Sequence, residues 1–75
     1  MTREQFLDAM AKLVEMPAGA LKGPERLNEI AQWNSLAMIG FIALVDFNNR
    51  VSLGPRQIMN CATVSDLLRV ARVDS

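Results

Sequence analysis

The stretch Trp33-Asn34-Ser35-Leu36-Ala37 marks the start of the longest helix that the sequence predicts. Asn34 and Ser35 are both favoured at a helix N-cap, because their short side chains accept hydrogen bonds from the first free N–H groups. Residues 36–45 are then apolar or glycine, so this helix is expected to be buried on more than one side. We predict a helix from Ser35 to Phe47, with Ser35 exposed at its positive end, where a phosphate group is stabilised.

An earlier helix is predicted from Arg3 to about Glu15. Thr2 and Gln5 have the spacing of a capping box, and Pro17 is expected to end the helix because the residue before a proline avoids helical angles. Residues 16–32 then form a long connection, with a short helical turn at residues 24–28. The expected apolar anchors of this connection are Leu21, Leu27 and Ile30.

Two shorter helices are predicted after the long one. Asn48-Asn49-Arg50 is expected to end the long helix, since asparagine tolerates a left-handed conformation, and Gly54-Pro55 opens a helix from Arg56 to about Asn60. Thr63, with Asp66 three residues later, caps a fourth helix. The expected inward-facing residues of these helices and the loop between them are Phe41, Ile42, Val45, Val51, Leu53, Ile58, Met59, Val64, Leu67, Leu68 and Ala71. The chain is therefore predicted to be an all-α four-helix bundle, one domain over residues 1–75.

Composition excludes several classes of function. With eight basic and eight acidic residues and no basic block, the chain lacks the charge pattern of a nucleic-acid-binding protein. Its single cysteine and lack of histidine give no metal cluster, and they fit a reducing cytoplasm. The polar start at residues 2–5 is unlike a signal peptide. The longest apolar run, residues 36–45, is far shorter than the roughly 20 residues that span a membrane, so no membrane insertion is expected.

The segment 33–37, together with Thr63-Val64-Ser65-Asp66-Leu67-Leu68 downstream, resembles an acyl carrier protein. The resemblance extends from Thr2 to Val70 and implies a small four-helix bundle with a long first loop and a short third helix. It also implies that Ser35 carries 4′-phosphopantetheine through a phosphodiester, and that the thiol of this arm holds an acyl group as a thioester.

The chain departs from the family pattern in three respects. Asn34 stands where the family usually has Asp, which keeps the cap and removes a charge that helps to present the serine to a phosphopantetheinyl transferase. Asn49 and Arg50 stand where an apolar residue and Gly are common. The net charge of zero also contrasts with the strongly acidic character of most family members.

The resemblance implies a monomeric carrier that is not an enzyme and that docks on a phosphopantetheinyl transferase, an acyl-loading ligase and acyl-processing enzymes. These partners belong to fatty-acid, polyketide or other secondary-metabolite synthesis. Residues expected at the attached arm are Asn34, Ser35, Leu36 and Met38. Residues expected to dock partners are Leu36, Ile39, Ala43 and Asp46. Because only Asp46 on this helix is acidic, docking should be more apolar and less salt-sensitive than is usual for fatty-acid carriers. Expected walls of a cargo cavity are Met38, Phe41, Ile42, Met59 and Ala62.

Several alternative interpretations remain open. The chain can instead be an unmodified carrier-like domain that acts as a protein-interaction module, which Asn34 and the neutral charge favour. Ser35 is then an ordinary helix-start residue. An enzyme is disfavoured, since general acid–base and nucleophilic groups are missing. Cys61 lacks a histidine that would generate its thiolate and is expected to be half-buried. Trp33 is expected to pack before the helix cap rather than to stack on a ligand, and Met38 can contact either the core or the arm.

Overall fold

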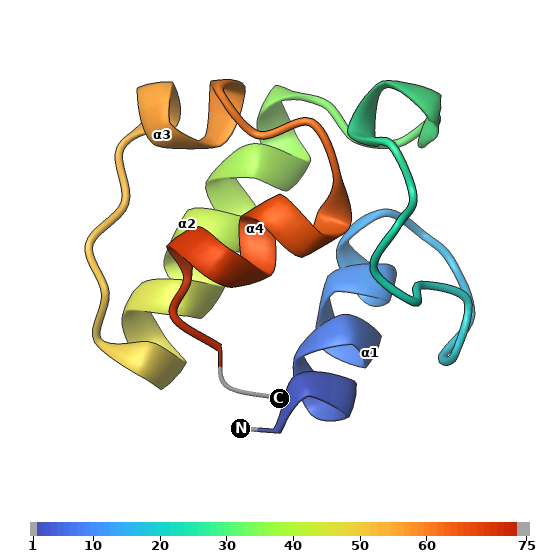
Figure 1. Cartoon of the computed structure of the whole chain (residues 1–75), viewed down its shortest axis with the longest axis horizontal. Helices are drawn as coiled ribbons and strands as arrows, with labels where there is room; N and C mark the ends of the chain where they lie inside the picture. The colour runs from blue at the N-terminus through green and yellow to red at the C-terminus, as the bar shows by residue number, and fades with distance from the viewer. Residues whose placement is uncertain (1, 74–75) are drawn as a thin grey trace.

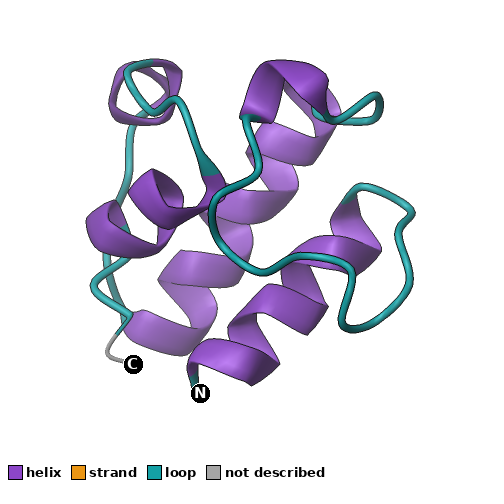
Figure 2. Ribbon diagram, turned by 45° about the vertical axis from the view of Figure 1, so that its right-hand side comes forward, coloured by secondary structure: helices purple, strands orange, loops and turns teal. Residues whose placement is uncertain are grey.

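The computed structural model describes residues 2–73, so residues 1, 74 and 75 of the predicted domain lie outside the described range. Four α-helices follow one another as α1 (Arg3–Leu13), α2 (Ser35–Asn49), α3 (Pro55–Met59) and α4 (Val64–Val70), with a 3-10 turn η1 (Leu27–Glu29) between α1 and α2 (Figure 1). No β-strand occurs between residues 2 and 73, and the α-helices are joined by loops, the first of which contains η1 (Figure 2). The predicted all-α class and the predicted number of helices are confirmed.

Both predicted capping boxes are present. Thr2 Oγ1 accepts a hydrogen bond from the Gln5 N–H at 3.1 Å, and the Thr2 N–H donates to Gln5 Oε1 at 2.9 Å. At the start of α4, Thr63 Oγ1 accepts from the Asp66 N–H at 3.2 Å, and Asp66 Oδ2 accepts from the Thr63 N–H at 3.1 Å. Each box satisfies N–H groups that have no partner inside the helix.

The first helix ends at Leu13, two residues before the predicted Glu15. Glu15 adopts a left-handed conformation with φ 58°. The N–H of the following residue, Met16, donates a hydrogen bond to the Ala11 carbonyl at 2.8 Å, as in a Schellman motif. The helix is thus ended by bonds to its own last carbonyls, and Pro17 is not needed to stop it.

The second helix continues to Asn49, two residues beyond the predicted end at Phe47. The left-handed residue is Arg50, with φ 55°, and its N–H bonds to the Asp46 carbonyl at 3.1 Å. The left-handed residue thus lies within the predicted stretch 48–50, but it is the arginine rather than an asparagine. Asn49 stays helical, and its side-chain amide donates to the Ala71 carbonyl at the end of α4 at 2.9 Å.

The core is centred on Phe41, which is fully buried in the middle of α2. The ring of Phe6 from α1 packs edge-on against it, with centroids 5.7 Å apart. Trp33, just before α2, packs against it in the same manner at 6.2 Å, as expected for an apolar residue that precedes a helix cap. Further predicted core residues are also buried, namely Val45, Leu53, Ile58, Val64, Leu67, Leu68 and Ala71.

Three predicted inward-facing positions differ in the structure, and one of them, Val51 in the loop before α3, is half-buried rather than buried. Met59 is 72% exposed, so its predicted inward orientation was wrong. The helix α3 has only five residues, and Ile58 alone takes the buried position, which leaves the next side chain about 100° away around the helix. Ile42 is half-buried rather than fully buried, because Phe41 occupies the centre of the core.

The long first loop is held against the start of α4. Its predicted anchors Leu21, Leu27 and Ile30 are buried. The Val64 N–H bonds to the Glu25 carbonyl at 3.0 Å, and the Leu27 N–H bonds to the Ala62 carbonyl at 2.9 Å. The short turn predicted at residues 24–28 forms at Leu27–Glu29 instead.

Candidate functional site

Ser35 is the first residue of α2, and its side chain is exposed. Asn34 is the N-cap, and its Oδ1 accepts a hydrogen bond from the Ala37 N–H at 3.0 Å. The Asn34 carbonyl accepts from the Met38 N–H at 2.9 Å, which begins the helical hydrogen bonds. Within residues 2–73 the Ser35 hydroxyl has no hydrogen-bond partner, so it is free to carry an attached group.

Two backbone N–H groups at this helix start are also free. The backbone N–H groups of Ser35 and Leu36 have no acceptor within the part of the chain that the structure describes. The corresponding groups of α4 are occupied, because the N–H groups of Val64 and Ser65 bond to carbonyls of the first loop. The start of α2 can therefore offer N–H donors to an anion, and the start of α4 cannot.

The electrostatic surroundings of Ser35 favour a negative group. The positive end of a helix dipole stabilises anions in its first turn. No acidic residue lies in the first turn of α2, since Asn34 stands at the cap. A phosphate attached to Ser35 would thus meet the helix dipole without repulsion from a neighbouring carboxylate.

A hollow of about 370 Å³ lies between the start of α2 and α3. Of the five residues predicted to wall a cargo cavity, Met38, Met59 and Ala62 line this α2–α3 hollow. Phe41 and Ile42 do not line it. Phe41 is instead fully buried in the core, where its ring packs against Phe6 and Trp33. The hollow is lined in addition by Arg26, Leu27, Asn28, Trp33, Ile58 and Cys61.

A second hollow, of about 530 Å³, lies between α1 and the start of α2. Its apolar lining includes Leu13, Leu36, Ile39 and Gly40, with Lys12 and Glu15 at its α1 side. A Cβ atom added at Gly40 would lie 2.9 Å from Leu13 Cδ2, so the glycine lets α1 approach α2 closely. We refer to this space as the α1–α2 hollow.

The residues predicted to dock partners are all exposed. Leu36 and Ile39 are 78% and 64% exposed, and Ala43 and Asp46 are exposed further along α2. Sequence reasoning missed Phe47, which is 86% exposed. It lies four residues after Ala43 and continues the same side of the helix, and this spacing within the predicted helix was sufficient to identify it. We call Leu36, Ile39, Ala43 and Phe47 the α2 outer face.

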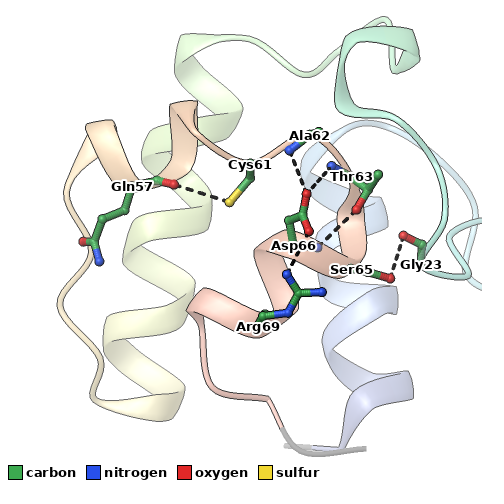
Figure 3. Close-up of polar contacts among 8 residues, drawn as sticks. All are labelled: Gly23, Gln57, Cys61, Ala62, Thr63, Ser65, Asp66 and Arg69. Atoms are coloured by element: carbon green, nitrogen blue, oxygen red, sulfur yellow. Dashed lines mark hydrogen bonds and ion pairs between the residues drawn. The ribbon is translucent and has the colours of Figure 1, made fainter.

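Cys61 is half-buried between α3 and α4, as predicted. Its Sγ lies 3.3 Å from the Gln57 carbonyl (Figure 3). Burial raises the pKa of the Cys61 thiol, and the nearby Asp66 carboxylate raises it further. The thiol is therefore held in its neutral form, which makes it a poor nucleophile.

Two carboxylates bind backbone N–H groups. Asp66 accepts from Ala62 at 2.9 Å as well as from Thr63 (Figure 3), and these bonds lower its pKa. Burial opposes the charge on Glu25, but bonds from the N–H groups of Gly23 and Lys22, both at 2.8 Å, outweigh it and lower the pKa. Both carboxylates thus hold loops in place.

Comparisons with known proteins provide no further identification. No family model matches the chain, and neither the curated proteins nor the solved structures contain a match to it. Within residues 2–73 no three histidine, cysteine or acidic residues are grouped as metal ligands would be. No helix in the described range has the length and apolar character required to cross a membrane.

Proposed function

We propose that this chain is an acyl carrier protein, with 4′-phosphopantetheine attached to the hydroxyl of Ser35. The observation that carries the proposal is the free Ser35 hydroxyl on the first residue of the longest helix, beside the two free N–H groups of Ser35 and Leu36. A phosphodiester at this position is stabilised by the helix dipole and remains accessible to an enzyme that builds it.

The carrier itself contributes no catalytic group. The thiol at the end of the arm binds the acyl group, and the protein brings it to each enzyme in turn. Tethering raises the effective concentration of the acyl group at a docked enzyme and so replaces a bimolecular encounter by an almost intramolecular one. The neutral, half-buried Cys61 thiol does not compete with the arm for acyl groups, since attack on an acyl carbonyl needs a thiolate.

The α2–α3 hollow is the best place for the base of the arm or the first part of the acyl chain. It is next to Met38, three residues after the attachment position, and Met59 and Cys61 add soft apolar surface to it. An acylated sample should therefore show methyl chemical-shift changes at Met38 and Met59. Changes confined to the outside of α2 would contradict this placement.

Docking on partner enzymes is proposed for the α2 outer face together with Asp46. No charged residue occurs between Ser35 and Asp46, so salt should have little effect on the affinity of enzymes for this surface. Such docking is more consistent with a specialised pathway, such as polyketide or other secondary-metabolite synthesis, than with general fatty-acid synthesis. A steep loss of enzyme affinity between low and high salt would contradict it.

A second candidate function is that of an unmodified carrier-like module that binds other proteins. Asn34 favours it, because the carboxylate usual at this cap is missing, and so does the large exposed ring of Phe47. In this case the α2 outer face is the functional surface, and Ser35 has no chemical role.

Intact-mass measurement after co-expression with a broad-specificity phosphopantetheinyl transferase tests the proposal. The expected result is a gain of one phosphopantetheine, absent from Ser35→Ala. If the wild-type chain gains nothing, Asn34→Asp is measured in the same assay. A gain in Asn34→Asp alone would show that the transferase requires the carboxylate. No gain in either chain would overturn the carrier proposal in favour of the interaction module.

A further inference from the structure

The α2 outer face is apolar along the whole helix and points away from the core. Three of its four side chains, Leu36, Ile39 and Phe47, are between 64% and 86% exposed. From Leu36 to Phe47 the face is about 16 Å long, given a rise of 1.5 Å per residue. Large apolar side chains gathered on one face are characteristic of interaction surfaces rather than of free protein surface.

The face combines a projecting ring at one end with a hollow at the other. Phe47 projects from the C-terminal end of α2, and the α1–α2 hollow, lined by Leu36, Ile39 and Gly40, opens at the N-terminal end. Along the helix, Leu36 and Phe47 are equally many residues away from the midpoint between residues 41 and 42. Gly40 and Ala43 lie symmetrically about the same point, so the two smallest residues of this side are at its centre.

We propose that the α2 outer face binds a second copy of this chain, with the two α2 helices antiparallel about a two-fold axis. Such an axis, placed beside residues 41 and 42, brings Phe47 of each copy to the α1–α2 hollow of the other. The same operation sets Gly40 opposite Ala43, and their small size allows the helix axes to come close. A closed, self-complementary pair of this kind forms from one surface alone.

Charge supports a second copy rather than a charged partner. Residues 36–45 contain no ionisable group, and the charged side chains beside the face and its hollow, Asp46, Lys12 and Glu15, are of mixed sign, so the face does not match a strongly acidic or strongly basic surface. A second copy presents the same uncharged side chains. The formal net charge of zero also means that two copies do not repel each other over long range.

The area of the face indicates a weak dimer. The exposed side chains of two copies together would bury roughly 1,000 Å², which lies at the lower limit for a specific interface. We therefore expect a weak dimer whose population depends on protein concentration. The dimer covers the residues proposed to dock enzymes, so dimerisation and docking exclude each other. The pairing uses the unmodified chain and does not depend on a group at Ser35.

Sedimentation equilibrium of the full unmodified chain between about 10 µM and about 1 mM tests the pairing. The average mass should rise from 8.3 kDa towards twice that value. Phe47→Glu should remain monomeric throughout. Met59→Glu is the matched control, because Met59 is similarly exposed but lies on α3, outside the face, and it should dimerise as the wild type does. Circular dichroism checks that each variant is folded, and Ile39→Glu replaces Phe47→Glu if that variant unfolds.

A disulfide tests the antiparallel register. Ala43→Cys, introduced together with Cys61→Ala, places a thiol near the proposed axis, and mild oxidation should link two copies. Met59→Cys in the same background should link far more slowly. The proposal is overturned by a mass that stays at 8.3 kDa, by equal effects of Phe47→Glu and Met59→Glu, by growth beyond a dimer, or by equal cross-linking at positions 43 and 59.

Discussion

The Ser65 hydroxyl of α4 donates a hydrogen bond to the Gly23 carbonyl at 2.9 Å, across 42 positions of the chain. The Ser65 backbone N–H donates to the same carbonyl at 2.8 Å (Figure 3 shows both residues). Gly23 has a φ of 130°, and a Cβ there would lie 2.6 Å from Arg3 Nη2 and 2.8 Å from Ser65 Oγ. This close contact fixes the first loop on α4, and so fixes the loop that leads into Ser35.

Gly23→Ala should destabilise the protein more than Gly19→Ala does. Both glycines have positive φ, so both substitutions strain the backbone, but nothing lies within 4 Å of a Cβ at Gly19. We expect Gly19→Ala to lower the free energy of unfolding by about 1 kcal/mol. Gly23→Ala should lower it by about 2–3 kcal/mol, because its φ of 130° is harder for an L-residue to adopt and because the Cβ would displace the Ser65 hydroxyl, whereas the flexible end of Arg3 can move away. Urea denaturation measures both values, and equal losses would mean that the contact with α4 is unimportant.

The same substitution at two phenylalanines of α2 should affect the free energy of unfolding very differently. Phe41→Ala empties the centre of the core and should cost about 3–5 kcal/mol, which is most of the stability of a chain of this size. Phe47→Ala removes an exposed ring and should change the stability by less than about 0.5 kcal/mol. Thermal unfolding at low protein concentration, where pairing of copies is absent, provides the comparison. A large loss in Phe47→Ala would show that the ring packs within the monomer.

A glycine at the end of α1 should stabilise the protein. Glu15 has φ 58°, a conformation that costs an L-residue about 1–2 kcal/mol and costs glycine little. Glu15→Gly should therefore raise the free energy of unfolding by about 0.5–1 kcal/mol. Lys12→Gly is the control, since Lys12 is exposed within α1 and glycine there should lower the free energy by about 1 kcal/mol. If both variants are destabilised, the helix does not end in this motif.

Acid should destabilise the protein through the carboxylates that hold its loops. The hydrogen bonds from Ala62 and Thr63 lower the pKa of Asp66 in the folded state. A lowered carboxyl pKa contributes stability above the unfolded pKa, about 3.9 for Asp, and this contribution is lost as pH falls through the folded pKa. The melting temperature should thus fall below about pH 4, and more gently in Asp66→Asn than in the wild type. Identical pH profiles would show that Asp66 contributes nothing to the acid sensitivity.

Helix starts were predicted well because their signals are local. The pairs Thr2 with Gln5 and Thr63 with Asp66 lie three residues apart, so each capping box forms within one helical turn whatever surrounds it. The exposed position of Ser35 follows in the same way from Asn34 at the cap. The candidate site could therefore be located before any tertiary contact was known.

Helix ends and the exposure of Met59 were predicted less well because distant contacts decide them. Asn49 remains in α2 while its side chain bonds to Ala71, and Glu15 ends α1 without the glycine that usually marks such an end. Met59 is exposed because Ile58 alone fits against the core. None of these outcomes has a signal within a few residues of the position concerned.

The sequence by itself determined the helical class, the capped helix starts and the place of Ser35, because these depend on neighbouring residues within one turn. The tertiary structure alone decided how completely each position of α2 is buried. Residues 36–45 are apolar all around the helix, so the pattern placed Phe41 and Val45 inside and Leu36, Ile39 and Ala43 outside, but it did not distinguish the half-buried Ile42 from the buried positions. Packing of Phe6 on Phe41, and of Leu13 over Gly40, sets these degrees of burial and leaves Phe47 exposed.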